Sequence, residues 1–158
     1  SGLVVGREEL IANMRVNGPP NQRIGRSMKV SKEAMIGLMA AVERAVSRDE
    51  AKLWHDWSTT VDQWFDAWME RAPMGVDIWR ENRNEAGEPI PRVLMRFGHD
   101  AAWNRDQFIE TLRDGDPIIE VVQNDATSIA FSPHLLRDGE AAQVARVVND
   151  LLLGGGNR

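Results

Sequence analysis

The chain has 158 residues, of which 42% are hydrophobic and 27% are charged, and its formal net charge is −5. This size and hydrophobic content suffice for a packed core, and the absence of cysteine excludes disulfides, thiolate metal ligands and a thiol nucleophile. An acidic balance without a long block of like charge argues against a broad contact with nucleic-acid phosphates. No apolar run is long enough to span a membrane, and we expect a cytoplasmic protein.

The first expected elements are a short strand and a short helix. Leu3–Val5 is an apolar run that ends at Gly6, which is typical of a buried strand, and Arg7–Met14 predicts a helix. A buried strand needs neighbours on both edges, so we expect further polypeptide to pair with it. Ser1 stands where an initiator Met would, and we interpret it as a processed, cleaved or engineered end.

A turn followed by a cluster of cations comes next. Gly18, Pro19 and Pro20 predict a stiff turn, and Ser31 is placed to cap a helix. Because the N-terminal end of a helix attracts anions, cations that precede it predict an anion site, with a solvated surface or a salt bridge as the alternative. The cations between the turn and the helix are Arg23, Arg26 and Lys29, and Lys32 follows the cap.

Two helices are expected in the middle of the chain. In Ser31–Ser47 apolar residues recur at three- and four-residue spacing, which predicts an apolar stripe. Arg48–Arg71 predicts a long helix with a seam of apolar side chains that includes four of the six tryptophans. Such a seam can stack on a ligand, but packing in a core or an interface is the more common use of tryptophan.

The remaining chain predicts the order strand, strand, helix, strand, strand, helix. Strands are expected at 76–81 and 92–97, and Asn104 with Gln107 predicts a capping box at the start of a helix. A hairpin over residues 117–131 would turn at Asn124-Asp125, and Asp138 would cap the last helix. This order is typical of an α+β layer with helices on one face of a mostly antiparallel sheet.

Several segments carry a resemblance to one family. They are Ser1–Ile11, Gly18–Gln22, Ile24–Arg26, Met28–Val30, Lys32-Glu33, Ile36–Glu43 and Leu112–Ile118. In these segments the chain resembles the pyridoxal-phosphate enzymes related to L-seryl-tRNA(Sec) selenium transferase, a family that includes D-glucosaminate-6-phosphate ammonia-lyase. The resemblance covers nearly the whole chain and implies the C-terminal portion of a fold-type-I enzyme, with both α/β and α+β parts.

This resemblance implies three parts of a larger enzyme. Residues 1–47 would be the end of the large domain with an active-site loop, 48–74 a long connecting helix, and 75–158 a small α+β domain. The lysine that holds the cofactor, pyridoxal 5'-phosphate, as a Schiff base lies just before Ser1 in the family pattern. No catalytic residue is therefore expected in this chain, Ser1 and Gly2 would contact the cofactor, and the polypeptide that carries the lysine would be a partner in a homo-oligomer.

The chain's own lysines leave another assignment open. Lys29, Lys32 and Lys52 could each hold the cofactor, and the cations around Lys29 offer a route to an activated amine. The resemblance argues against Lys29, because the family's lysine precedes Ser1. Lys52 is most simply interpreted as a solvated residue on a charged helix face.

The resemblance also places the substrate site. Two anion-binding arginines of the selenium transferases fall on Arg26 and Lys29, and Asn21 and Gln22 lie in the same motif. Lys29 departs from the family pattern, because the point charge of a lysine replaces the planar guanidinium of an arginine. This difference favours the binding of a substrate carboxylate or phosphate over selenium chemistry. Fold-type-I enzymes often hold the substrate carboxylate with an arginine of the small domain. The candidates for it are Arg113, Arg92 and Arg96.

Two functions remain open from the sequence. The first is part of a pyridoxal-phosphate-dependent lyase or transferase that acts on an amino acid or amino sugar acid by elimination, ammonia-lyase or racemase chemistry. The second is a non-catalytic α+β module that binds a partner through the tryptophan-rich helix. The histidines show no metal-ligand spacing. His134 follows a strand and could face a cleft, but a role in a turn is the favoured interpretation. We expect no metal, membrane or nucleic-acid partner.

Overall fold

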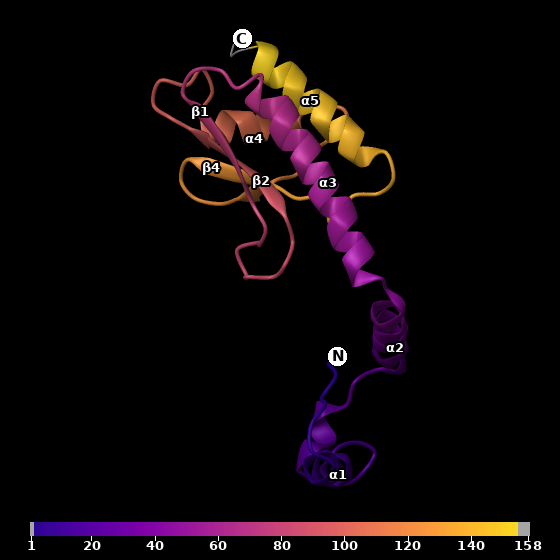
Figure 1. Cartoon of the computed structure of the whole chain (residues 1–158). Coiled ribbons are helices and arrows are strands. Elements are labelled where there is room, and N and C mark those ends of the chain that lie inside the picture. Colours follow the sequence, from indigo (N-terminus) through magenta and orange to yellow (C-terminus); the bar gives the residue numbers. More distant parts are fainter. Residues whose placement is uncertain (1, 155–158) are drawn as a thin grey trace. The chain divides into compact units, whose positions relative to one another are not determined.

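The structure, a computed structural model, describes residues 2–154 and divides into two compact units. Unit 1 is Ser1–Asp49 and unit 2 is Glu50–Arg158. Figure 1 shows the helices of unit 1 and, in unit 2, a sheet with helices. The two units are described separately below.

Unit 1 contains two α-helices and one 3-10 helix. They are α1 (Glu8–Asn17), η1 (Ile24–Met28) and α2 (Lys32–Ser47). The predicted cap of α2 is confirmed, since the Ser31 hydroxyl accepts a hydrogen bond from the backbone N–H of Ala34 at 3.1 Å. None of these helices buries a residue, so the apolar stripe predicted on α2 is not covered within the described part of the chain.

The strand predicted at Leu3–Val5 is wrong for this structure. These residues form no strand, and the side chain of Val5 is 82% exposed. A strand is stable only when a neighbouring edge satisfies its backbone groups, and no segment among residues 2–154 pairs with this one. The apolar pattern alone therefore did not determine its conformation.

Unit 2 is a mixed α+β structure with a four-stranded antiparallel sheet, as the sequence predicted. The strands are β1 (Val76–Glu81), β2 (Arg92–Phe97), β3 (Val122–Gln123) and β4 (Ser128–Phe131), in the order β1-β2-β4-β3. β1 and β2 have the predicted bounds. β3 is shorter than predicted, because the backbone N–H of Ile119 donates to the carbonyl of Leu112 in α4 at 2.9 Å.

Three helices pack on one face of this sheet. They are α3 (Glu50–Met69), α4 (Arg105–Arg113) and α5 (Glu140–Gly154), and α3 runs beside α5 in Figure 1. The shared core contains Ile78, Met95 and Ile129 from the sheet, Trp64 and Trp68 from α3, Phe108 and Leu112 from α4, and Val148 and Leu152 from α5.

The tryptophan seam packs in this core, which confirms the packing interpretation. Trp64 and Trp68 are 2% and 0% exposed, and their rings stack with centroids 5.3 Å apart. The indole Nε1 of Trp64 also donates to the carbonyl of Ala141 in α5 at 3.0 Å. The exposed tryptophan on this helix is Trp54, at 42%.

The local signals at the starts of α4 and α5 had different outcomes. The capping box of Asn104 and Gln107 is present, so that prediction is confirmed. α5 begins at Glu140 rather than directly after Asp138, and the Glu140 carboxylate accepts a hydrogen bond from the backbone N–H of Arg137 at 2.8 Å. The cap position directly precedes the first helical residue, whereas Asp138 lies two residues before Glu140. The predicted cap at Asp138 is therefore wrong by one position.

Candidate functional site

Hydrogen bonds to the end of α1 and within the loop itself order the loop between α1 and α2. The Asn21 side chain donates to the carbonyl of Arg15 at 3.1 Å, and Nη1 of Arg26 donates to the carbonyl of Pro20 at 2.8 Å. Gly25 lies so close to the end of α1 that a Cβ there would come within 2.7 Å of the Asn17 carbonyl oxygen. These contacts order the loop and hold the Arg26 side chain at its base.

Arg26 and Lys29 are thus on the short segment that leads into α2. Arg26 is half-buried and lies in η1, while Lys29 is exposed and follows η1 directly. The carboxylate of Glu33 already occupies the N-terminal end of α2. Hydrogen bonds from the backbone N–H of Glu33 and from the Ser31 side chain lower the pKa of this carboxylate. An anion at this place would consequently be held by the two cationic side chains rather than by the N–H groups of the helix.

The remaining residues expected near a cofactor or substrate in unit 1 are open to solvent. Gln22 is exposed, and a Cβ added to Gly2 would meet nothing within 4 Å. Ser1 lies outside the described residues. The structure therefore brings Asn21, Gln22, Arg26 and Lys29 into one loop.

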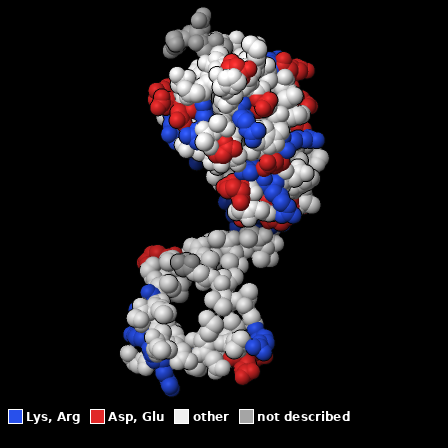
Figure 2. Space-filling model, turned by 90° about the vertical axis from the view of Figure 1, so that its left-hand side faces the viewer, with Lys and Arg blue, Asp and Glu red and all other residues white. Residues whose placement is uncertain are grey.

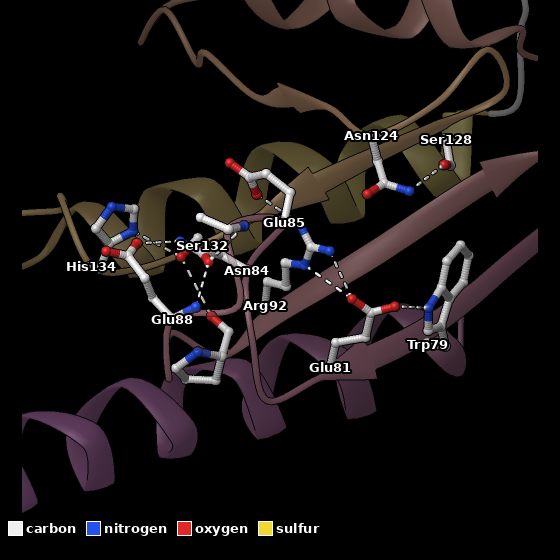
Figure 3. A network of polar contacts seen from close by, with 12 residues as sticks. Trp79, Glu81, Asn84, Glu85, Glu88, Arg92, Asn124, Ser128, Ser132 and His134 are labelled. Carbon is white, nitrogen blue, oxygen red and sulfur yellow. Dashed lines mark hydrogen bonds and ion pairs between the residues drawn. The ribbon is translucent and has the colours of Figure 1, made fainter.

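The small-domain arginines lie in unit 2 and differ in their partners. Nε of Arg113 donates to both carboxylate oxygens of Glu120, at 3.1 and 2.9 Å. Arg92 is buried between Glu81 and Glu85, in the network of Figure 3. The guanidinium of Arg96 stacks over the ring of Trp79 at 4.9 Å. Arg96 has no carboxylate in ion-pair contact within the described part of the chain.

The lysines give a test of how well this chain fits pyridoxal phosphate. Lys29, Lys32 and Lys52 are exposed, and Lys52 forms an ion pair with Asp56 at 2.5 Å. A lysine that carries this cofactor is activated by desolvation or neighbouring cations, and none of the three is buried. The residues of this chain are better suited to bind an anion, through Arg26 and Lys29, than to attach the cofactor covalently.

A polar contact that the sequence did not predict lies in unit 2. The Ser132 hydroxyl is 2.9 Å from Nδ1 of His134 and 3.4 Å from the carbonyl of Pro91 (Figure 3). If Ser132 donates to Pro91, it accepts from the Nδ1 hydrogen and leaves Nε2 as an acceptor. Both residues line a cavity of about 370 Å³. The available signal was the position of His134 directly after a strand, but the cavity depends on contacts distant in sequence.

The surface charge and the acidic and histidine side chains do not indicate a further binding site in the described part of the chain. On the face of unit 2 seen in Figure 2, Lys and Arg side chains are interspersed with Asp and Glu. Residues 2–154 contain no group of three or more acidic or histidine side chains arranged to hold a metal ion. None of the helices in that range combines the length and apolarity needed to cross a bilayer.

No family model matches the chain, and no curated protein matches it. The resemblance to the selenium transferases therefore depends on the segments quoted above.

Proposed function

We propose that this chain is part of a pyridoxal-phosphate-dependent enzyme related to L-seryl-tRNA(Sec) selenium transferase. It would act together with polypeptide that carries the cofactor lysine, on an amino acid or amino sugar acid. The reaction would be an elimination, an ammonia-lyase reaction or a racemisation. When bound, the cofactor would supply the electron sink for this chemistry.

The observation that carries this proposal is the ordered loop with Arg26 and Lys29. In the proposed enzyme, where further polypeptide would cover unit 1, the contacts to Arg15 and Pro20 would hold the loop before a substrate arrives, so that less conformational entropy is lost on binding. Arg26 keeps Nε and Nη2 for an anion after Nη1 has bonded to Pro20, and Lys29 adds a second charge. In this proposal both residues hold the carboxylate or phosphate of the substrate.

The exposed surface of unit 1 supports the need for further polypeptide. None of its helices buries a residue, although α1 and α2 carry apolar side chains such as Met14 and Met39, which are 52% and 63% exposed. Large apolar side chains left exposed on neighbouring helices of one unit are typical of an interface. The large domain of the proposed enzyme, or a second copy of the enzyme, would cover it.

Substitution of Lys29 tests the anion site. Among the hydrogen bonds that the structure describes, none that holds the loop involves Lys29, so its removal should leave the loop in place. In the natural protein that contains this chain, Lys29→Ala should lower kcat/KM by about tenfold or more, the loss of one charge-assisted hydrogen bond. Lys29→Arg should retain most of the activity. The substrate for this assay is the amino acid or amino sugar acid with the highest turnover in a screen.

Arg23→Ala is the matched control, since Arg23 is an exposed cation of the same loop. It should leave kcat/KM and the bound cofactor unchanged. Equal kinetics for Lys29→Ala and the parent protein would exclude Lys29 from the substrate site. An equal loss in Arg23→Ala would show that only the general positive charge of the loop matters.

A further inference from the structure

A cavity of about 370 Å³ lies in unit 2 near the place where β3 separates from β4. Its floor includes the buried side chains of Trp64, Phe131 and Val144. Its lining also includes Ile118 and Leu135, which are 70% and 80% exposed. This volume and this lining are within the range of ligand sites in proteins. The function proposed above does not use this cavity.

Beside the cavity, no strand among residues 2–154 pairs with Ser132, the residue that directly follows β4. The N–H of Phe97 donates to the carbonyl of Thr127, and Phe131 pairs with Val93, so the odd-numbered residues of β4 bond toward β2. Backbone groups in an antiparallel strand point alternately to the two sides, so a continuation of β4 by one residue would direct those of Ser132 toward the β3 side.

The strand that would pair with Ser132 ends too early. β3 starts at Val122, which pairs with Ala130. An unbroken ladder would place Glu120 opposite Ser132, but the Ile119 N–H bonds to α4 and draws the chain away. The cavity lies in the space that this divergence creates, and its lining includes both Glu120 and Ser132.

The acidic side chains that line the cavity give it one sign of charge. They are Glu120 and Glu140, and no lysine or arginine lines it. Glu120 is partly neutralised by Arg113 at 2.9 Å, and Glu140 accepts one backbone hydrogen bond, from Arg137. The ends of a bound chain would consequently be favoured if they were basic and disfavoured if they were acidic.

We propose that this site binds an extended peptide that has apolar residues flanked by basic ones, paired with Ser132 where the chain continues past β4. Its backbone would exchange hydrogen bonds with the N–H and C=O of Ser132. Side chains alternate along a strand, so a neighbouring apolar residue of the peptide would point to the same face as Phe131 and enter the cavity. Its basic ends would approach Glu120 and Glu140.

The test is an NMR titration of the ¹⁵N-labelled full 158-residue chain with the peptide acetyl-Lys-Val-Leu-Val-Lys-amide. The amides of Ser132 and of the cavity lining should shift, and the variant Ser132→Pro, which removes the N–H, should bind about tenfold more weakly or not at all. Proline restricts the residue before it to the extended conformation that Phe131 already has, but it also fixes its own φ, so the amide spectrum of the rest of unit 2 in Ser132→Pro is compared with that of the parent chain to show that the fold is kept. Ser132→Ala keeps the N–H, loses only the hydroxyl, and should bind like the parent chain.

A second variant makes the test independent of the proline. Leu135→Ser removes an exposed apolar side chain of the cavity lining, adds no charge, and should weaken binding without loss of the fold. The acidic peptide acetyl-Glu-Val-Leu-Val-Glu-amide should bind more weakly than the basic one. The proposal is overturned if the amide of Ser132 does not respond at millimolar peptide, if Ser132→Pro binds as well as Ser132→Ala, or if the acidic peptide binds as tightly. Shifts of the same amides with protein concentration alone would assign the site to a second copy and would also overturn it.

Discussion

At the scale of single residues, Arg92 is a buried charge with two carboxylate partners. Its side chain is 8% exposed, and Nε and Nη2 donate to Glu81 at 3.1 and 2.7 Å (Figure 3). Nη1 donates to Glu85 at 2.9 Å. The hydrogen bond from Arg92 lowers the pKa of Glu81. A buried guanidinium is tolerated only while these partners remain.

Removal of the carboxylate of Glu81 should therefore cost more than removal of the guanidinium. Glu81→Ala leaves Arg92 buried with one partner, and we expect a loss of about 2–3 kcal/mol in the free energy of unfolding. Arg92→Met keeps an apolar side chain in place and should cost less, because Glu81 and Glu85 reach water. Glu85→Ala is the control and should cost below about 1 kcal/mol, since Glu85 is 61% exposed. Urea denaturation measures all three, and a larger loss in Arg92→Met than in Glu81→Ala would contradict this account.

At the scale of an element, the turn between β3 and β4 is held by the carboxylate of Asp125. Oδ1 accepts hydrogen bonds from the backbone N–H groups of Thr127 and Ser128, at 2.8 and 2.9 Å, and from the Thr127 hydroxyl. The bond from the Thr127 N–H is the largest of several effects that lower the pKa of Asp125 from 3.8 to about 2. The ionised form of Asp125 is therefore favoured in the folded state.

This shift predicts a pH-dependent effect of Asp125→Asn. A lowered pKa contributes stability that is fully present above about pH 4 and is lost as the pH falls through about 2. Asp125→Asn should consequently lower the urea midpoint at pH 7, and the difference from the parent chain should shrink toward pH 2. Asp138→Asn, at an exposed residue before α5, is the control. A difference that is the same at both pH values would assign the effect to geometry rather than to charge.

The elements that could be predicted from the sequence depend on local signals. The capping box at Asn104, the Ser31 cap and the bounds of β1 follow from residues close together in the chain. The strand at Leu3–Val5 could not be settled in this way, because a strand depends on a neighbour that the sequence pattern does not name. The sites show the same difference. Arg26 and Lys29 lie on one loop that the local sequence predicts. The cavity at Ser132 could not be predicted, because it arises where β3 ends early and depends on residues far apart in the chain.

At the scale of the whole molecule, the two units differ in how much they bury. Unit 2 has a continuous core, whereas the helices of unit 1 bury no residue. Short helices without tertiary packing are marginal in water, so unit 1 should be ordered mainly by what it contacts. The exposed apolar side chains of unit 1 are Leu3, Val4, Val5, Leu10, Met14, Val16, Ile24, Met28, Val30, Met35, Ile36, Met39 and Val46.

Hydrogen exchange should reveal this difference in the isolated 158-residue chain. We expect the amides of β2, β4 and the buried turns of α3 to exchange slowly, and those of α1 and α2 to exchange within the first time points. In the proposed enzyme, α1 and α2 should become protected, because the large domain or a second copy would cover them. Protection of α2 equal to that of β2 in the isolated chain would contradict the need for a covering partner.

The central claim is that this chain works beside a pyridoxal phosphate whose lysine lies elsewhere in the enzyme. Borohydride reduction fixes this cofactor on its lysine, so peptide mapping by mass spectrometry of the reduced natural protein locates the attachment directly. We expect a phosphopyridoxyl group on a lysine other than Lys29, Lys32 and Lys52, and the visible absorbance of the cofactor before reduction. Absence of any modified lysine in protein supplied with pyridoxal phosphate, or modification at Lys29, would contradict the account.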